Sequence, residues 1–360
     1  MQHYRVGIVG CGEATQILHL PSLHQLSEQF SVTAACDVSA MVLEGVADRW
    51  NIPHRFAEYR ELVNHSAVDV VLVANPSLDH AEVVLAALQA GKSVLAEKPL
   101  CLTLRETDAI IAAREKSGLI VQVGYMRRYA PAFVRACQLV QEMDGIRIAC
   151  VHDMIGSNSR FIQPTSPVIK GTDIPSEVAS ATAALHEQLV AEAIGDTSAN
   201  IRKAYNLMLG LSSHDLSAMR ELLGMPRRVL YAAQRQRGMY LSAAFDYDSF
   251  VCQFETGMDR IPRFDCYLEV YSGDQVVRVS YNTPYIRNLP IRLTVTRATD
   301  GGVTESDENP AWGDAFTHEW TAFYDNLVHQ RIPKTSPEDF RHDLELFREM
   351  ARMMAQEENG

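Results

Sequence analysis

The sequence lacks the features that would place it at a membrane or on nucleic acid. Among its 360 residues, no apolar run reaches the roughly 18 residues that a membrane-crossing helix needs. No block of Lys or Arg supplies a stripe that could follow nucleic-acid phosphates, and the net charge of −12 opposes such binding. We therefore expect neither a membrane nor a nucleic-acid partner.

Cysteine pairs with metal or redox spacing are also missing. The seven cysteines are scattered and form no C-x-x-C motif, so buried free thiols in a reducing cytoplasm are the simplest interpretation. The pair His152-Asp153 has no third ligand at a suitable spacing, so no metal site is predicted. The first residues run directly into a strand-like stretch without a basic start, which favours a cytoplasmic location.

Near its start the sequence has a glycine turn between an apolar strand, residues 4–10, and a helical stretch that continues to Leu26. Gly10 allows a tight turn, Gly12 lets a pyrophosphate approach the backbone, and the helix N-terminus attracts phosphates. The third glycine of the G-x-G-x-x-G pattern is absent, and Thr15 takes its place. The residues expected to bind the dinucleotide here are Gly10, Gly12, Glu13, Ala14 and Thr15.

A carboxylate follows the next expected strand. Residues 31–36 end at Asp37, about 20 residues past the glycine turn, where a carboxylate accepts the ribose hydroxyls of NAD and repels a 2′-phosphate. No basic residue follows in 38–40. We expect NAD rather than NADP. The alternative is that Asp37 only caps the helix expected over residues 39–51.

Strands and helices continue to alternate up to residue 125, which predicts a doubly wound parallel sheet. Strands are expected over 68–74, 94–96 and 119–125, and helices over 80–90 and 103–116. The stretch SVLAEKP ends one of these strands with Lys98, a cation that is costly beside a buried strand unless something uses it. The alternative is that Lys98 leaves the sheet at a surface turn. Because ligands bind at the carboxyl ends of parallel strands, the loops there should converge on one crevice.

Four stretches resemble the glucose–fructose oxidoreductase / inositol dehydrogenase / MocA (Gfo/Idh/MocA) family: GIVGCGEATQILHLPSL, ANPSLDHAEVVLAALQAGKSVLAEKPL, VGYMRRY and SSHDLSAMRELLG. The resemblance implies a Rossmann domain over residues 1–125. It also implies a substrate-binding and oligomerisation α/β domain over 126–360, built on a large, mostly antiparallel open sheet. Members are mostly NAD(P)-dependent dehydrogenases and reductases of sugars, cyclitols and their derivatives. A homodimer or homotetramer is the assembly implied.

By the motif match, Lys98 is the main acid/base and His214 the second. Family members usually carry an aspartate one helical turn before that histidine, and here Gly210 stands there. Either Lys98 and His214 suffice, or another group takes part, for which Asp153 and Tyr281 are candidates. Arg127, Arg128 and Arg160 are candidates for holding an acidic substrate.

The resemblance and the strand-end positions together give the remaining expected site residues. Those expected to bind the cofactor, beyond the glycine turn and Asp37, are Ala74, Asn75, Pro76, His80, Glu97, Lys98 and Arg127. Those expected to bind substrate are Lys98, Tyr125, Arg127, Asp153 and His214.

The second domain is expected to open with a helix over 131–143 and a strand over 146–155, followed by a polar loop over 156–171 that lies over the pocket. An inserted helix over 176–194 should pack near the substrate mouth or an oligomer contact, and a helix over 201–223 carries His214. Six strand-like runs between 228 and 298 predict one antiparallel meander, and two helices, 315–330 and 337–356, close the chain.

These observations favour an NAD-dependent dehydrogenase or reductase of a polyol, sugar or sugar derivative. One alternative is an enzyme that retains NAD and oxidises a sugar carbon transiently, for elimination or glycoside cleavage. Another is an NAD-binding regulator without turnover.

Overall fold

The structure is a computed structural model that describes residues 2–174, 176–308 and 312–359. It groups into two compact units. The first comprises Met1–Tyr125, Ser166–Ala193 and Phe316–Leu344, and the second Met126–Thr165, Ile194–Ala315 and Glu345–Gly360. The assignment of domains to residues 1–125 and 126–360 stays a prediction.

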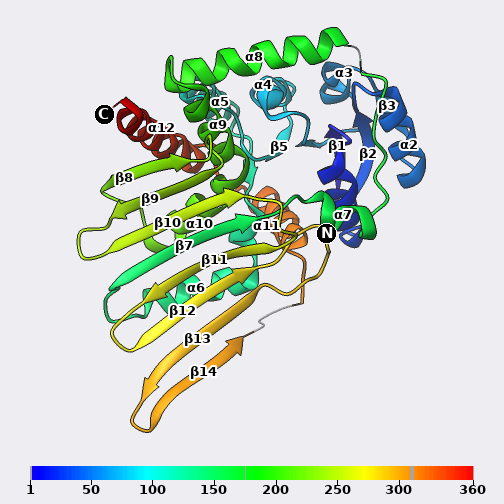
Figure 1. Cartoon of the computed structure of the whole chain (residues 1–360). Coiled ribbons are helices and arrows are strands. Elements are labelled where there is room, and N and C mark those ends of the chain that lie inside the picture. The colour runs from blue at the N-terminus through cyan, green and yellow to red at the C-terminus, as the bar shows by residue number, and fades with distance from the viewer. Residues whose placement is uncertain (1, 175, 309–311, 360) are drawn as a thin grey trace. The chain divides into compact units, whose positions relative to one another are not determined.

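The first unit is built on a six-stranded parallel sheet in the order β3-β2-β1-β4-β5-β6; Figure 1 labels β1, β2, β3 and β5 of this sheet. This confirms the doubly wound fold predicted from the alternating pattern. The strands are β1 Tyr4–Val9, β2 Phe30–Cys36, β3 His54–Phe56, β4 Val70–Val73, β5 Ser93–Glu97 and β6 Val121–Gly124. The helices are η1 Thr15–His19, α1 Leu20–Gln25, α2 Ala40–Trp50, α3 Tyr59–Asn64, η2 Ser77–Asp79, α4 His80–Gln89 and α5 Leu104–Ser117.

Local sequence explains where these elements begin and end. Helix α5 starts with a capping box in which the Thr103 and Glu106 side chains bond each other's backbone N–H groups, and it ends at Gly118 in a left-handed conformation, φ 68°. Strand β4 is buried at every position, as expected of a central parallel strand. The short elements β3 and α3 were not predicted, because a strand of three half-buried residues and a helix of six residues are too short to give a periodic signal.

Two later segments complete the first unit. Helix α11 (Ala315–His329) places Trp320, which is fully buried, 5.2 Å between ring centroids from Phe30 of β2. The hydroxyl of Tyr324 donates to the carbonyl of Gln2 at 2.8 Å. Helix α8 (Ser176–Ile194) was predicted with its bounds. Its apolar face is only partly buried, because Val178 is exposed while Leu189 is buried.

The second unit is built on an eight-stranded sheet in the order β14-β13-β12-β11-β7-β10-β9-β8. Its strands are β7 Ile148–Ile155, β8 Arg228–Arg235, β9 Tyr240–Asp246, β10 Val251–Met258, β11 Phe264–Tyr271, β12 Gln275–Tyr281, β13 Arg292–Thr299 and β14 Gly302–Glu308. The prediction of one antiparallel meander is wrong, because β7 lies between β11 and β10 and pairs with β10 in parallel. Strand β14, a polar and exposed strand, was not predicted.

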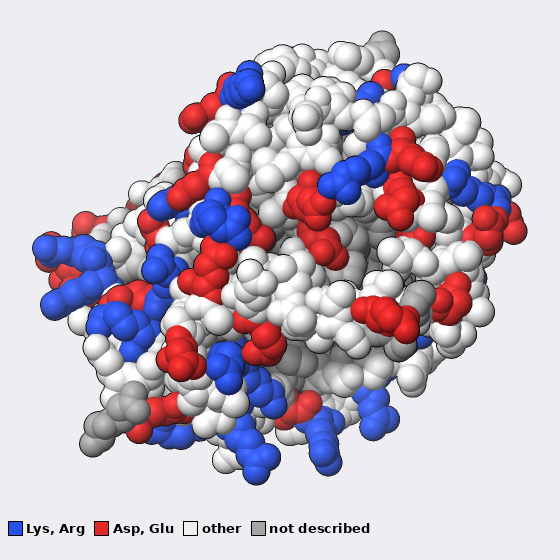
Figure 2. All heavy atoms as spheres, turned by 90° about the horizontal axis from the view of Figure 1, so that it is seen from above, with Lys and Arg blue, Asp and Glu red and all other residues white. Residues whose placement is uncertain are grey.

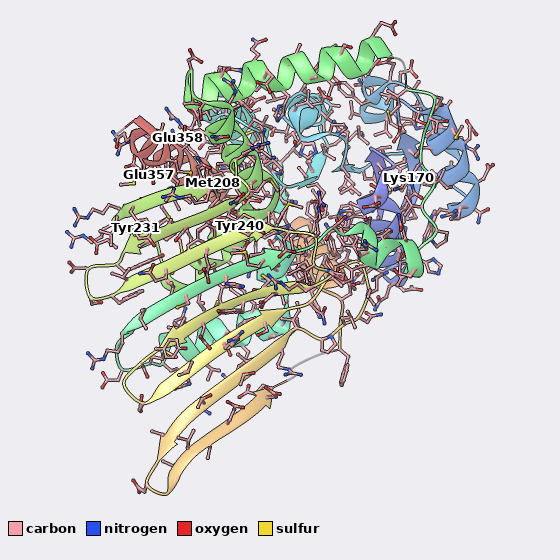
Figure 3. The ribbon with its side chains drawn as sticks, in the orientation of Figure 1. Lys170, Met208, Tyr231, Tyr240, Glu357 and Glu358 are labelled. Carbon is pink, nitrogen blue, oxygen red and sulfur yellow. The ribbon has the colours of Figure 1, made fainter. Side chains whose placement is uncertain are left out.

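Helices cover this sheet on one side. Figure 1 shows α6 Pro131–Gln141, α9 Ala199–Leu207 and α10 Ser213–Leu223 on that side. The unit also contains η3 Met126–Tyr129, η4 Met208–Ser212 and the end of α12 (Pro337–Asn359). Helix α6 packs on β12 and β13, and α10 packs on β7. The carboxylate of Glu358, labelled in Figure 3, accepts hydrogen bonds from Ser198 of the α9 cap and Gln234 of β8.

The stretch 156–171 differs from the loop that was expected, because Ser159–Thr165 forms helix α7. All seven cysteines are free thiols. Among the described residues, no helix combines the length and apolar character needed to span a bilayer. On the face shown in Figure 2, basic and acidic side chains are interspersed rather than gathered into a basic stripe.

Candidate functional site

In the first unit, the loops after four neighbouring parallel strands meet at one edge of the sheet. Strand β1 lies between β2 and β4, and β5 follows β4. Their carboxyl ends therefore bring Gly10, Asp37, Asn75 and Lys98 to the same edge, as the sequence predicted. This is the edge at which open α/β sheets bind ligands.

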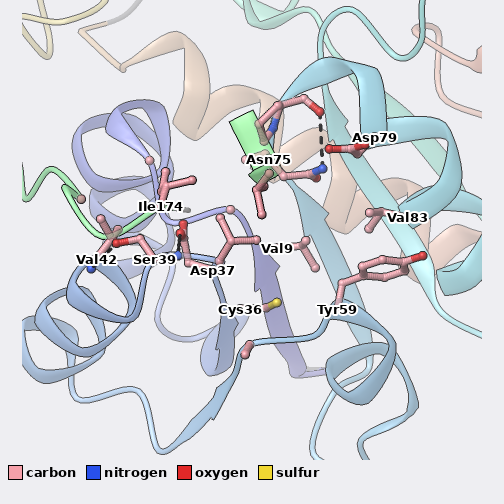
Figure 4. Close-up of a pocket in the computed structure, with 18 of the residues that line it drawn as sticks. Val9, Cys36, Asp37, Ser39, Val42, Tyr59, Asn75, Asp79, Val83 and Ile174 are labelled. Atoms are coloured by element: carbon pink, nitrogen blue, oxygen red, sulfur yellow. Dashed lines mark hydrogen bonds between the residues drawn. The ribbon is translucent and has the colours of Figure 1, made fainter. Parts of the chain in front are cut away.

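A cavity of about 650 Å³ opens at this edge. Figure 4 shows Asp37 and Ser39 on one side of it, Asn75 and Asp79 on another, and Ile174 facing the space between. The predicted cofactor residues that line it are Gly10, Gly12, Glu13, Asp37, Ala74, Asn75 and Pro76. The lining that was not predicted as cofactor-binding includes Tyr59, Val83 and the later residues Val168, Ile169, Lys170, Gly171, Ile174, Val178 and Thr182.

The glycine turn has the shape that a pyrophosphate needs. Gly10 has φ 94°, and a Cβ there would collide with the backbone of Ala74 and Asn75, so only glycine lets the turn approach the end of β4. A Cβ at Gly12 would meet nothing within 4 Å, so this face of the turn is open toward the cavity. The buried Thr15 hydroxyl donates to the Gly10 carbonyl at 2.6 Å and so stabilises the turn. Thr15 and Ala14 are absent from the cavity lining.

Asp37 is held in place by backbone donors. Its Oδ2 accepts from the Cys11 N–H at 2.8 Å and its Oδ1 from the Ser39 N–H at 2.9 Å. The cap of α2 is Ser39, whose hydroxyl accepts from the Val42 N–H at 3.1 Å. The alternative that Asp37 serves only as the helix cap therefore fails. Each carboxylate oxygen keeps a second lone pair for a ribose hydroxyl.

Lys98 follows directly on β5 and is half-buried, with its N–H donating to Glu97 Oε2 at 3.1 Å. Glu97 Oε1 lies 2.9 Å from Nε2 of the buried His19, whose Nδ1 lies 3.1 Å from the indole Nε1 of Trp320. Because the indole is a donor only, His19 Nδ1 accepts and Nε2–H donates to Glu97. Burial raises the pKa of Glu97, but the His19 hydrogen bond and the Lys98 charge outweigh it and the net pKa is lowered.

His80 joins two of the strand-end loops. Its Nδ1 lies 2.8 Å from the Pro99 carbonyl oxygen and its Nε2 2.7 Å from the Asn75 carbonyl oxygen. Burial lowers the pKa of His80, and the two carbonyl oxygens oppose that shift. His80 is absent from the cavity lining, so its contacts are with the loops themselves.

In the second unit, His214 lies on α10 and is 8% exposed. The π-helical turn η4 precedes it and contains Gly210, where an added Cβ would meet nothing within 4 Å. A Cβ therefore fits at the position where the resemblance implies an aspartate. The neighbouring Asp215 is fully buried.

Arg127, Asp153, Asp215 and Cys266 form a buried cluster in the second unit. The Arg127 guanidinium donates to Asp215, to Asp153 at 3.2 Å and to the Cys266 sulfur at 3.0 Å. Burial lowers the pKa of Arg127, but Cys266, Asp215 and Asp153 outweigh it and raise the net pKa. Burial and the Asp153 charge raise the pKa of Asp215. Although Asp153, Asp215 and Cys266 lie close enough to ligate a metal, the guanidinium already provides their cation.

Of the remaining predicted residues, Tyr125, Arg128 and Tyr281 have partners in the interior, and Arg160 does not lie there. Tyr125 is fully buried and its hydroxyl donates to Asp343 at 2.8 Å. Arg128 donates to Glu221 at 2.5 Å, and the ring of the buried Tyr281 lies 5.1 Å from the Arg127 guanidinium carbon. Arg160 is exposed on α7. The described contacts of Tyr125 and Arg128 are structural, and a substrate role for any of these residues stays a prediction.

Comparison with known proteins gives a family match in the first unit. A model described as an oxidoreductase family with an NAD-binding Rossmann fold, Gfo/Idh/MocA, matches residues 4–125. An inositol 2-dehydrogenase of Salmonella typhimurium is 34% identical over 138 residues, which are 38% of this chain and 41% of that protein. An inositol 2-dehydrogenase/D-chiro-inositol 3-dehydrogenase of Shouchella clausii is 37% identical over 162 residues, 44% and 46% of the two chains. The similarity thus spans less than half the length of these relatives.

Solved structures extend the likeness of fold to the whole chain. The myo-inositol 2-dehydrogenase of Lactobacillus plantarum has a TM-score of 0.72 at 18% identity, covering 98% of this chain and 97% of that one. A 3-ketoreductase of Actinomadura kijaniata, in complex with TDP-benzene and NADP, has a TM-score of 0.73 at 19% identity, covering 96% of both chains. At these identities the likeness shows the fold alone, and it covers the residues of both units.

Proposed function

From the match of residues 4–125 to the Gfo/Idh/MocA oxidoreductase model, we propose that this chain belongs to that family and is an NAD-dependent dehydrogenase or reductase. Its substrate is the secondary hydroxyl or keto group of a sugar, cyclitol or sugar derivative. The inositol dehydrogenases among its relatives support this substrate class. A cytoplasmic location, expected from the scattered cysteines, and a homodimer or homotetramer, implied by the resemblance, are part of the proposal.

The observation that carries the proposal is the cavity at the carboxyl edge of the parallel sheet. Lys98 does not line this cavity but follows β5 at the same edge, two strands away from the glycine turn. Gly12 leaves open the face on which a pyrophosphate would lie, and Asp37 presents its carboxylate to an adenosine ribose. The same edge continues past Asn75 to Lys98. A dinucleotide that follows this edge would place its reactive end near the ammonium group.

Lys98 has the chemistry that oxidation of an alcohol requires of the protein. A bound nicotinamide would accept the hydride from the carbinol carbon. The hydroxyl proton must leave at the same time, and Lys98 in its neutral form would take it. In the reverse direction the Lys98 ammonium would return the proton to the carbonyl oxygen. His214 would serve as the second proton-transfer group.

The preference for NAD over NADP rests on Asp37. A 2′-phosphate at the adenosine ribose would meet the carboxylate charge of Asp37, and no basic residue stands in the three positions that follow it. The backbone N–H groups of Cys11 and Ser39 keep this carboxylate at the cavity.

One observation favours a second candidate function. Gly210 leaves open the position where the family usually has a carboxylate beside the histidine. An enzyme that retains NAD, and oxidises a sugar carbon only transiently for elimination or glycoside cleavage, would tolerate such a change in the acid/base set. A regulator without turnover is less well supported, because Lys98 and His214 are both present.

The test is NADH formation across a panel of inositols, aldoses, sugar acids and glycosides, with NAD and NADP in parallel. Net reduction of NAD by a cyclitol or sugar is expected. Product formation without net NADH would instead favour the retained-cofactor enzyme. If the protein binds NAD but yields no product from any compound, the proposed activity is wrong.

A further inference from the structure

Residues 166–174, here called the strap, connect α7 to the region of α8 and form one wall of the cavity described above. Val168, Ile169, Lys170, Gly171 and Ile174 of the strap line this cavity, together with Val178 and Thr182 of α8. Figure 3 labels Lys170 on this segment. All of these residues belong to the first unit, so the wall and the glycine turn are parts of one body.

Backbone contacts hold the strap against the nucleotide-binding elements. The Gln16 side chain, which directly follows the glycine turn, donates to the Ile169 carbonyl and accepts from the Ile169 N–H, both at 2.9 Å. The same amide donates to the Cys11 carbonyl at 2.9 Å. Arg49 of α2 donates to the Pro167 carbonyl at 2.8 Å. The strap is therefore tied to both the glycine turn and α2.

Close packing explains why small residues stand at two of these contacts. A Cβ at Gly45 of α2 would lie 2.8 Å from Ile169 Cδ1. A Cβ at Gly171 would lie 2.8 Å from Ser39 Cβ and collide with its hydroxyl. Any larger side chain at Gly171 would push the strap away from the end of β2.

The Asp173 carboxylate accepts hydrogen bonds at the start of α2. It accepts from the Ser39 hydroxyl and, at 3.0 Å, from the Met41 N–H in the first turn of α2. These bonds to Ser39 and the backbone hold the pKa of Asp173 below its usual range. Asp37 bonds the N–H of the same Ser39. Two carboxylates from distant parts of the sequence thus meet at one serine.

This arrangement bears directly on recognition of a 2′-phosphate. In a Rossmann domain that phosphate lies beyond the end of β2, where a hydroxyl and the N–H groups of the following helix are natural anion-binding groups. Here the Ser39 hydroxyl and the Met41 N–H already bind the carboxylate of Asp173. A phosphate would have to displace an anion that belongs to the protein and would face Asp37 as well.

Three residues before Asp173, the strap carries a cation. The ammonium of Lys170 lies 3.9 Å from the Glu13 carboxylate, beside the open face of the glycine turn. The strap therefore has a cation paired with Glu13 near the glycine turn, apolar side chains along the cavity, and the carboxylate of Asp173 beside Ser39. The carboxylate at Ser39 suits an adenosine ribose without a 2′-phosphate.

We propose that the strap is the outer wall of the adenosine half of the dinucleotide site, and that Asp173 is a second specificity residue that excludes NADP. The proposal rests on the dinucleotide site proposed above and deepens it. The charge that would exclude the 2′-phosphate is the carboxylate of Asp173, which lies in the strap and is distant in sequence from the glycine turn.

The test is calorimetric binding of NAD and of NADP to the full chain, independent of any substrate. The wild type should bind NAD and bind NADP at least about 100-fold more weakly. In Asp173→Asn, the NADP affinity should rise about tenfold, because one like charge is removed, while the NAD affinity stays within about threefold. Asp325→Asn on α11, which removes an exposed carboxylate of the same unit, is the matched control and should change neither affinity.

A second variant tests the wall itself. Gly171→Ala keeps every charge but pushes the strap from Ser39, so it should weaken NAD binding, with the fold checked by thermal unfolding. Absence of NAD binding to the wild type would overturn the dinucleotide site and this inference together. If the wild type binds NAD but Asp173→Asn and Asp325→Asn give equal NADP affinities, only the role of Asp173 is wrong.

Discussion

The carbonyl oxygen of Pro99 lies 2.8 Å from Nδ1 of His80, a buried ring whose other nitrogen contacts the Asn75 carbonyl oxygen. One imidazole thus connects the loops after β4 and β5. Since Pro99 directly follows Lys98, His80 fixes the backbone that presents the proposed acid/base. A cofactor contact of His80 stays a prediction, and its contacts with the Pro99 and Asn75 carbonyl oxygens favour a positioning role.

Replacing His80 should therefore affect turnover more than cofactor binding. We expect His80→Ala to lower kcat about tenfold or more, because small displacements of an acid/base group are costly, with NAD affinity changed by less than about threefold. His80→Gln, which keeps a polar group in reach of one carbonyl, should recover part of the loss. Steady-state kinetics beside NAD titration make the comparison. A loss of thermal stability with unchanged kcat would mean that His80 is only structural.

A carboxylate introduced at Gly210 tests the departure from the family pattern. The open space there accepts the side chain, and the helix propensities of glycine and aspartate differ by less than about 1 kcal/mol, so Gly210→Asp should fold. We expect net oxidation of a cyclitol or sugar to increase several-fold if an acidic group there assists His214. Gly210→Asn is the control that adds a similar volume without the charge. Equal rates for the two variants would mean that a carboxylate at residue 210 does not assist His214.

The buried carboxyl of Asp215 gives a prediction of stability against pH. Its folded-state pKa is raised, so the folded state binds the proton more tightly than the unfolded state does. The stabilising contribution of this proton is present below the unfolded pKa, near 3.8, and is lost as pH rises toward the folded pKa. Asp215→Asn imitates the protonated form. Its free energy of unfolding relative to wild type should therefore increase as pH rises from about 4 to neutral, measured by urea unfolding.

The guanidinium that compensates these carboxylates should be hard to remove. Arg127→Met leaves Asp153 and Asp215 buried without their cation and should destabilise the protein by about 3–5 kcal/mol. The triple variant Arg127→Met, Asp153→Asn, Asp215→Asn removes the charges together and should recover much of that loss in the same unfolding measurement. Equal stability of the single and triple variants would mean that the buried charges do not interact as described.

The first unit could be predicted well because its signals are local. Glycines at a strand–helix turn, a carboxylate after the next strand and continuous apolar runs specify a parallel sheet and the edge proposed to bind the cofactor. The predicted ends of the helix over 39–51 are the two caps of α2: Ser39 is its N-cap, and Asn51 ends it in the left-handed conformation. Weak or non-local signals were missed. The insertion of β7 between β10 and β11 depends on pairing across about 100 residues, which no turn or period in the sequence specifies.

The same limit applies to the candidate site. Asp37 and Lys98 follow buried strands and could be found from that context alone. Asp173 stands in a polar stretch with no periodicity, and its partner Ser39 is 134 residues away. The partners of Arg127, which are Asp153, Asp215 and Cys266, come from three separate elements. Only the folded arrangement shows that these charges are buried together.

The central claim is that Lys98 moves the proton in an oxidation that depends on NAD. The most direct measurement compares wild type with Lys98→Ala for NADH formation from a cyclitol or sugar that the wild type oxidises, with the NAD dissociation constant measured beside it. We predict that kcat falls by about 100-fold or more, while NAD affinity stays within about threefold. Undiminished turnover in Lys98→Ala would contradict the account.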